Sequence, residues 1–252
     1  MTVIDRPVRL PRLAFLTAWE LQSLGTPHPV VGINDLYLTD EMRADILRRT
    51  LARLTDLGLA TPHGLKPPLQ RTLATIASAT REFYAWSSFR NGDAGAILVA
   101  SSGNDAVRLI TDGAIVHLDA VDGDQLAQHF VETLPDVPGA RVRSIAMPTS
   151  DFNGGHDFGD PLAEPSVTQQ QAARLRELME AERDAVHQLY VAVRDDQDVR
   201  HRSVPMSAID LPHRGRVMTF LSGEDQGRDI INLVPGTPAK LISILKATIG
   251  GL

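Results

Sequence analysis

The chain has 252 residues, a net charge of −6 and no cysteine. The absence of thiols excludes disulfides, thiolate metal sites and cysteine nucleophiles, and the acidic balance argues against a nucleic-acid partner, which needs a basic surface. The hydrophobic content of 43% suffices for a substantial core, and no apolar run reaches the roughly 18 residues of a membrane span. No signal-peptide pattern surrounds Asp5 and Arg6, so we expect a cytoplasmic protein.

The N-terminal region predicts three amphipathic helices. Leucines recur at helical spacing with Trp19 over residues 13–24, and Gly25 is placed to end this helix. Thr39 is suited to cap a second helix, because two acidic residues follow it where carboxylates favour the helix dipole. The third helix is expected to open at Pro67.

The next region predicts four strands and one helix. Turn signals such as Asn91-Gly92 and Asp112-Gly113 separate short alternating runs, which is typical of hairpins. After these runs the apolar spacing changes to a helical period that Pro135 ends. The expected strands are 83–88, 96–101, 107–111 and 115–120.

Residues 148–165 form the least regular segment, and we interpret them as a linker. Asp151, Asn153, His156, Asp157 and Asp160 could in principle hold a metal. The spacing fits a calcium loop poorly, because a histidine falls where the loop needs glycine and no glutamate occupies the twelfth position. A metal-dependent enzyme that uses residues 151–160 therefore stays open as one alternative.

The remainder of the chain repeats the earlier pattern. Ser166 and Gln169 predict a capping box at the start of a helix, and a second set of strands leads to a closing helix opened by Pro238. The expected strands are 186–194, 203–210, 217–222 and 230–234. Two ββββα units predict an α+β fold with one central antiparallel sheet, flanked by helices and quasi-two-fold. The chain 1–252 is then a single domain with halves of about 1–147 and about 166–252, joined by the linker.

No motif indicates catalysis. The sequence has no Gly-x-Ser-x-Gly elbow, no His-Glu-x-x-His and no phosphate-binding glycine loop. None of the eight histidines is paired with a carboxylate by local spacing, so each is interpreted as structural. We expect neither enzymatic activity nor a cofactor or metal, and a small-ligand binding module with a pocket between sheet and helices stays open as a second alternative.

Several segments together resemble the EspG family, and their order and spacing agree with it over about residues 8–250. Asp184-Ala185 departs from the family's glycine-rich entry to the following strand, and residues 148–165 match no family pattern. The matching segments are Leu16-Thr-Ala-Trp19-Glu20-Leu21, Leu189-Tyr-Val-Ala-Val-Arg194-Asp195, Arg200-His-Arg-Ser203, Ala208-Ile209-Asp210 and Gly215-Arg216.

The resemblance implies a function by binding. Members of the EspG family are cytosolic chaperones of actinobacterial type VII secretion. They bind the apolar tip of the PPE protein in a PE/PPE heterodimer, keep it soluble and direct it to the secretion machinery. An exposed apolar tip would self-associate unless a complementary surface covered it. The resemblance also implies a central antiparallel sheet flanked by helices, and no need for ATP or a metal.

We expect the partner on the strand at 186–194, whose two faces differ. The aliphatic face, with Leu189, Val191 and Val193, is expected to pack on helices, which leaves the mixed face for a partner. Tyrosine and arginine dominate interfaces, and Trp86 in the first half is a further candidate that would equally suit the core. The candidate partner-binding residues are Gln188, Tyr190, Ala192, Arg194 and Trp86. Because sheet edges can pair with other copies, we expect a monomer or a weak dimer.

Overall fold

A computed structural model describes residues 3–32, 39–153, 165–223 and 229–252. The first half contains β1 (Val8–Pro11), α1 (Arg12–Leu21), α2 (Asp40–Asp56), β2 (Ala60–Thr61), β3 (Gly64–Leu65), α3 (Pro67–Ala77), β4 (Arg81–Phe89), β5 (Ala94–Ser102), β6 (Asp105–Thr111), β7 (Ile115–Ala120), the 3-10 turn η1 (Gly123–Gln125) and α4 (Leu126–Thr133). The second half contains β8 (Ile145–Pro148), α5 (Thr149–Asn153), α6 (Val167–Glu180), β9 (Ala185–Arg194), β10 (Arg200–Arg202), β11 (Met206–Leu211), β12 (Gly215–Gly223), β13 (Asp229–Pro235) and α7 (Pro238–Ile249).

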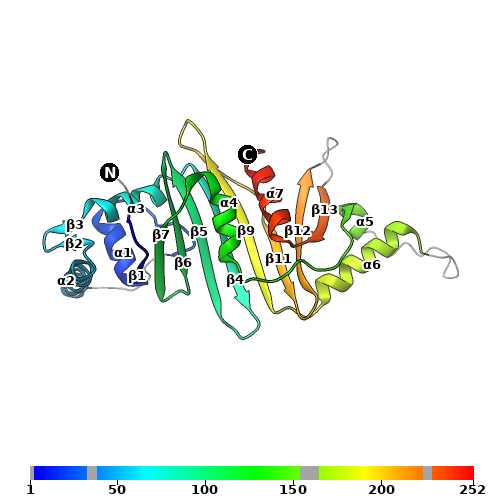
Figure 1. Ribbon diagram of the computed structural model, residues 1–252, viewed down its shortest axis with the longest axis horizontal. Helices are drawn as coiled ribbons and strands as arrows, with labels where there is room; N and C mark the ends of the chain where they lie inside the picture. The colour runs from blue at the N-terminus through cyan, green and yellow to red at the C-terminus, as the bar shows by residue number, and fades with distance from the viewer. Residues whose placement is uncertain (1–2, 33–38, 154–164, 224–228) are drawn as a thin grey trace.

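One antiparallel sheet runs through both halves (Figure 1). In the described part of the chain it has eleven strands in the order β1-β7-β6-β5-β4-β9-β11-β12-β13-β8, with β10 paired to β9. The predicted antiparallel sheet and all eight predicted strands are therefore confirmed; the strand at 115–120 has the predicted ends, and each of the others shifts by one to three residues at one or both ends. The halves meet where β4 pairs with β9.

Two short strands extend the predicted duplication. β1 pairs with β7 at one edge, and β8 pairs with β13 at the other, so each half has an outer strand that precedes its own helices and hairpins. Neither strand was predicted, because four residues are too few to show a reliable period of two. The segment predicted as a linker from 148 is also not all irregular, since Thr149–Asn153 forms α5.

The helix ends follow local chemistry. The hydroxyl of Thr39 accepts a hydrogen bond from the Met42 amide, and Ser166 and Gln169 form the reciprocal bonds of a capping box, as their spacing predicts. Prolines occupy the first turns of α3 and α7, where the missing amide proton costs nothing. These caps fix where the flanking helices begin.

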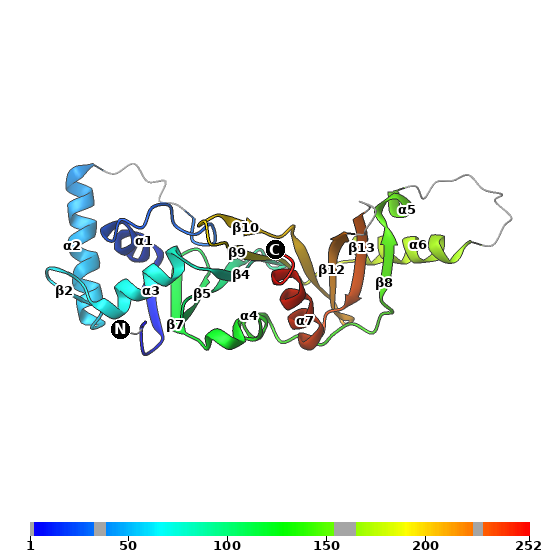
Figure 2. The same cartoon turned by 90° about the horizontal axis from the view of Figure 1, so that it is seen from above.

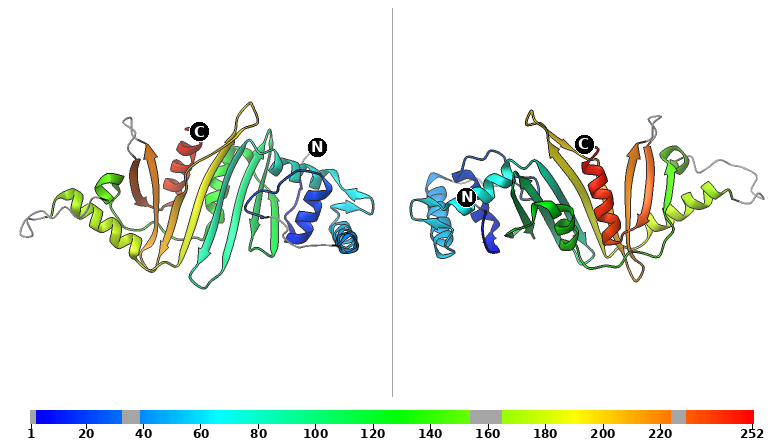
Figure 3. Two further views of the ribbon diagram at one scale, coloured as in Figure 1. Left: turned by 180° about the vertical axis from the view of Figure 1, so that it is seen from behind. Right: turned by 45° about the horizontal axis from the view of Figure 1, so that its top comes forward.

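Helices cover the two faces of the sheet unequally. On one face, called the helix face, α4 and α7 lie near the centre and pack against each other (Figures 1 and 2). On the other, called the open face, α1 and α3 cover the first half and α6 covers the far end of the second half. Seen from behind, the central strands are uncovered between α1 and α6 (Figure 3). Within the described residues, none of the helices has the length and apolar character to cross a membrane.

Candidate partner-binding site

The uncovered centre of the open face is formed mainly by β4, β9, β11 and β12. Trp86 and Gln188 are direct cross-strand partners, Gln188 is opposite Ser207, and Ser207 is opposite Thr219. Residues two apart on a strand share its face, and Arg202 reaches the ring of Tyr190 from β10. We call this surface the central strip, which comprises Trp86, Gln188, Tyr190, Arg202, Ser207, Thr219 and Leu221.

Aromatic rings form a rigid cluster at one end of the central strip. Tyr84 and Tyr190 stack with their ring centroids 5.2 Å apart. Trp86 contacts both edge-on, with centroid distances of 5.5 Å to each. Such geometry is favourable for aromatic pairs, and rings already held in place lose little entropy when a partner binds. Trp86 remains half-buried, so part of its indole stays available to a partner.

The two faces of β9 are used largely as predicted. Leu189 and Val191 have no exposed surface and pack in the core that contains α4 and α7. On the mixed face, Gln188 is exposed, whereas Tyr190 is only 8% exposed because the aromatic cluster covers its ring.

At the far end of the mixed face, Ala192 and Arg194 are less accessible to a partner than the sequence predicts. Ala192 has 0% exposure and belongs to the core beneath the N-terminal helices, so it offers no surface to a partner. Arg194 is half-buried, and its guanidinium bonds to the carbonyl oxygens of Ala79 and Asp198. The sequence pattern identifies the face of the strand but not how much of that face the first half covers.

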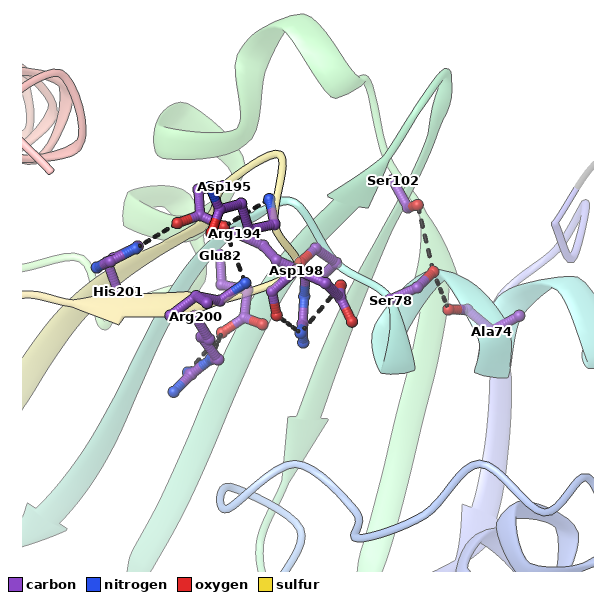
Figure 4. Close-up of polar contacts among 12 residues, drawn as sticks. Ala74, Ser78, Glu82, Ser102, Arg194, Asp195, Asp198, Arg200 and His201 are labelled. Carbon is purple, nitrogen blue, oxygen red and sulfur yellow. Dashed lines mark hydrogen bonds and ion pairs between the residues drawn. The ribbon is translucent and has the colours of Figure 1, made fainter.

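The hairpin between β9 and β10 is tied to the sheet by a buried carboxylate (Figure 4). Arg200 donates to Glu82 Oε2 from Nη2 at 2.6 Å and from Nε at 3.0 Å, and His28 Nε2 lies 3.3 Å from the same oxygen. Burial by itself would raise the pKa of Glu82, but the hydrogen bonds to His28 and Arg200 outweigh it and hold that pKa below its ordinary value. Glu82 therefore stays ionised and joins three separate parts of the chain.

A bulge separates β10 from β11 and explains a shifted strand. The amide of Val191 donates to the side-chain oxygen of Ser203 at 3.1 Å, and the Ser203 amide donates to the Val191 carbonyl at 2.9 Å. Pro205 has no amide proton to continue the ladder. The strand predicted from residue 203 thus begins at Met206, and Val204 is left 56% exposed beside the central strip.

A row of buried polar residues crosses the helix face, and the spacing of these residues along the sequence does not predict it. Ser87 Oγ lies 2.8 Å from His187 Nδ1, and His187 Nε2 lies 3.2 Å from Asp210 Oδ2. Arg216 donates to both oxygens of Asp210 at 2.6 and 2.9 Å. Burial would raise the pKa of Asp210, but the bonds to His187 and Arg216 prevail and lower it. We interpret the row as structural, because Arg216 neutralises Asp210 and also donates to the Pro135 carbonyl at 3.0 Å.

Neither open alternative gains support from the described residues. A hollow of about 1070 Å³ is lined by hairpin turns, by the ends of β4 to β7 and by the end of α4, and it is not enclosed between sheet and helices as a small-ligand site would be. In the described ranges no three histidine or acidic side chains are placed to hold a metal. Residues 154–160 of the predicted ligand loop lie outside the described ranges, so that alternative stays a prediction.

A broad sheet with an uncovered centre and a rigid aromatic cluster defines a protein suited to docking another protein. The model of the EspG family matches residues 11–247, and the chain belongs to this family, which confirms the resemblance seen in its sequence. Among solved structures, it is similar to the Mycobacterium tuberculosis type VII secretion system chaperone EspG5, determined in complex with a PE25-PPE41 dimer. The TM-score is 0.70 at 14% sequence identity, over 96% of this chain and 95% of that one. A search of curated proteins found no match.

Proposed function

We propose that this protein is a type VII secretion chaperone that binds the PPE subunit of a PE/PPE heterodimer on the central strip. The family match over residues 11–247 supports the class of activity. The observation that carries the site is the uncovered centre of the open face, where Trp86 and Gln188 lie side by side. A surface that combines a rigid aromatic cluster with small polar side chains suits an apolar helical tip.

This role requires binding alone. The client's apolar tip is kept from self-association by the surface that covers it, and no chemical step, nucleotide or metal takes part. Covering the tip is useful in the cytoplasm before export, so the chaperone acts there. One monomer binds one heterodimer, because the central strip occurs once per chain.

Co-expression with the PE/PPE pairs of the same organism tests the proposal. We expect one pair to co-purify as a stable complex with one copy of each chain, measured by size-exclusion chromatography with light scattering. Failure of every pair to form a complex would refute the proposed function.

The position of the site is tested by Gln188→Arg, which places a long charged side chain at the centre of the strip. We expect the affinity for the co-purified heterodimer to fall at least about tenfold, since blocking a central interface position removes hot-spot contacts. Gln128→Arg is the matched control, because Gln128 is exposed on α4 at the helix face. Equal affinities of the two variants in titration calorimetry would show that the heterodimer docks elsewhere.

A further inference from the structure

Arg202 is the one charged residue of the central strip. It is exposed, and its guanidinium carbon lies 5.1 Å from the centroid of the Tyr190 ring. Within the described residues, no carboxylate forms an ion pair with it. The neighbouring Arg200 differs, because buried Glu82 already neutralises it.

The cation–π contact with Tyr190 fixes how Arg202 meets a partner. An aromatic ring below the guanidinium attracts the cation and restricts its rotamers. The strand pairing of Arg202 with Ala192 fixes the backbone below it, and the bonds of Arg200 to Glu82 anchor the same short strand. Arg202 is therefore a positioned cation at the edge of an aromatic surface.

Covering this cation with an apolar surface alone would be unfavourable. A charge removed from water without a partner carries a large desolvation cost. A partner that seals the central strip must therefore supply an acceptor, and a carboxylate matches the two parallel donors of a guanidinium best. The net charge of −6 repels acidic proteins in general. A carboxylate of the partner is therefore favoured only where it meets a local cation such as Arg202, and this pairing also fixes the register of the partner on the strip.

From these contacts we infer that the client's apolar tip carries a carboxylate that pairs with Arg202 when the tip covers the central strip. This inference rests on the proposed function. It adds to that function the chemistry of the partner: an apolar helical tip with one acidic side chain at its border.

The test uses the full-length protein and the PE/PPE heterodimer that co-purifies with it. We expect Arg202→Gln to weaken binding about 30-fold or more, as truncation of one member of a covered charge pair does. The affinity of Arg202→Lys should lie between those of Arg202→Gln and the unchanged protein, because lysine keeps the charge but loses the planar fork of donors and its contact with the Tyr190 ring. Arg143→Gln is the matched control, an exposed arginine that precedes β8 outside the strip. Unchanged thermal unfolding of the Gln variant excludes a loss of fold.

Charge reversal identifies the partner group. Arg202→Glu should abolish binding, and replacing one acidic residue of the client tip by lysine should restore it to this variant while weakening binding to the unchanged chaperone. Wild-type affinity of Arg202→Gln would overturn the inference. It is equally overturned if no single reversal in the tip rescues Arg202→Glu. The proposed function fails separately, if the unchanged chaperone binds no heterodimer.

Discussion

The buried pair of Asp210 and Arg216 gives the sharpest prediction for stability. Their side chains are only 5% and 4% exposed, and Arg216 makes two bonds to the carboxylate and one to the Pro135 carbonyl. Replacing Arg216 by methionine keeps most of the apolar stem but leaves Asp210 without its cation. Removal of one partner from a buried ion pair costs about 3 to 5 kcal/mol. For a chain of this size that corresponds to a fall in Tm of roughly 6 to 20 °C.

Thermal unfolding followed by circular dichroism measures this loss. Arg214→Met is the control, since Arg214 lies two residues away and its pair with Glu177, at 3.5 Å, is solvent-exposed. Exposed pairs contribute about 0 to 1 kcal/mol. Replacing Asp210 by leucine in the Arg216→Met variant should recover part of the lost stability, because no charge is then left buried. Similar Tm values for the two single variants would refute the structural role assigned to the pair.

Two further predictions concern the loss of stability at low pH and the replacement of Gly236. Because the pKa values of Glu82 and Asp210 are lowered in the folded state, their contribution is fully present above the ordinary values of 4.5 and 3.8 and is lost as pH falls through the folded pKa values. The free energy of unfolding, from urea titrations, should therefore fall as the pH is lowered below about 5, and a constant value would contradict these assignments. Gly236→Ala would place Cβ 2.4 Å from Arg216 Cγ and 2.9 Å from its carbonyl oxygen, so we expect a loss of about 1 to 3 kcal/mol. At Gly223, an added Cβ meets no atom of the described residues within 4 Å, so Gly223→Ala should leave Tm nearly unchanged.

The sequence predicts the strands and helices well because their signals are local. Turn pairs such as Asn91-Gly92 and the capping box at Ser166 depend on residues within a few positions of one another. The doubled pattern also predicts the antiparallel sheet, since the same unit occurs on each side of an approximate two-fold axis. Short edge strands such as Val8–Pro11 lack enough residues to show alternation.

The candidate site and the buried polar row depend on contacts between residues that lie far apart in the sequence, so local patterns predict them only in part. Alternation on β9 places Gln188 and Ala192 on one face. It does not show that elements of the first half bury Ala192 and leave Gln188 exposed. Ser87 and His187 are 100 positions apart, so no spacing rule brings them together. Their contact follows from the pairing of β4 with β9, which is a property of the whole sheet.

The duplication itself explains why a docking surface exists at the centre of the molecule. The closing helix of each half, α4 or α7, covers the helix face near the junction, whereas the helices that precede each set of strands cover the open face toward the two ends (Figure 2). Each half alone would leave its first strand, β4 or β9, partly bare. Pairing β4 with β9 joins the two bare areas into one surface that neither half could provide. Polar Gln188 and Ser207 interrupt this surface, which limits self-association, while the aromatic cluster beside them retains the contacts that a partner can use.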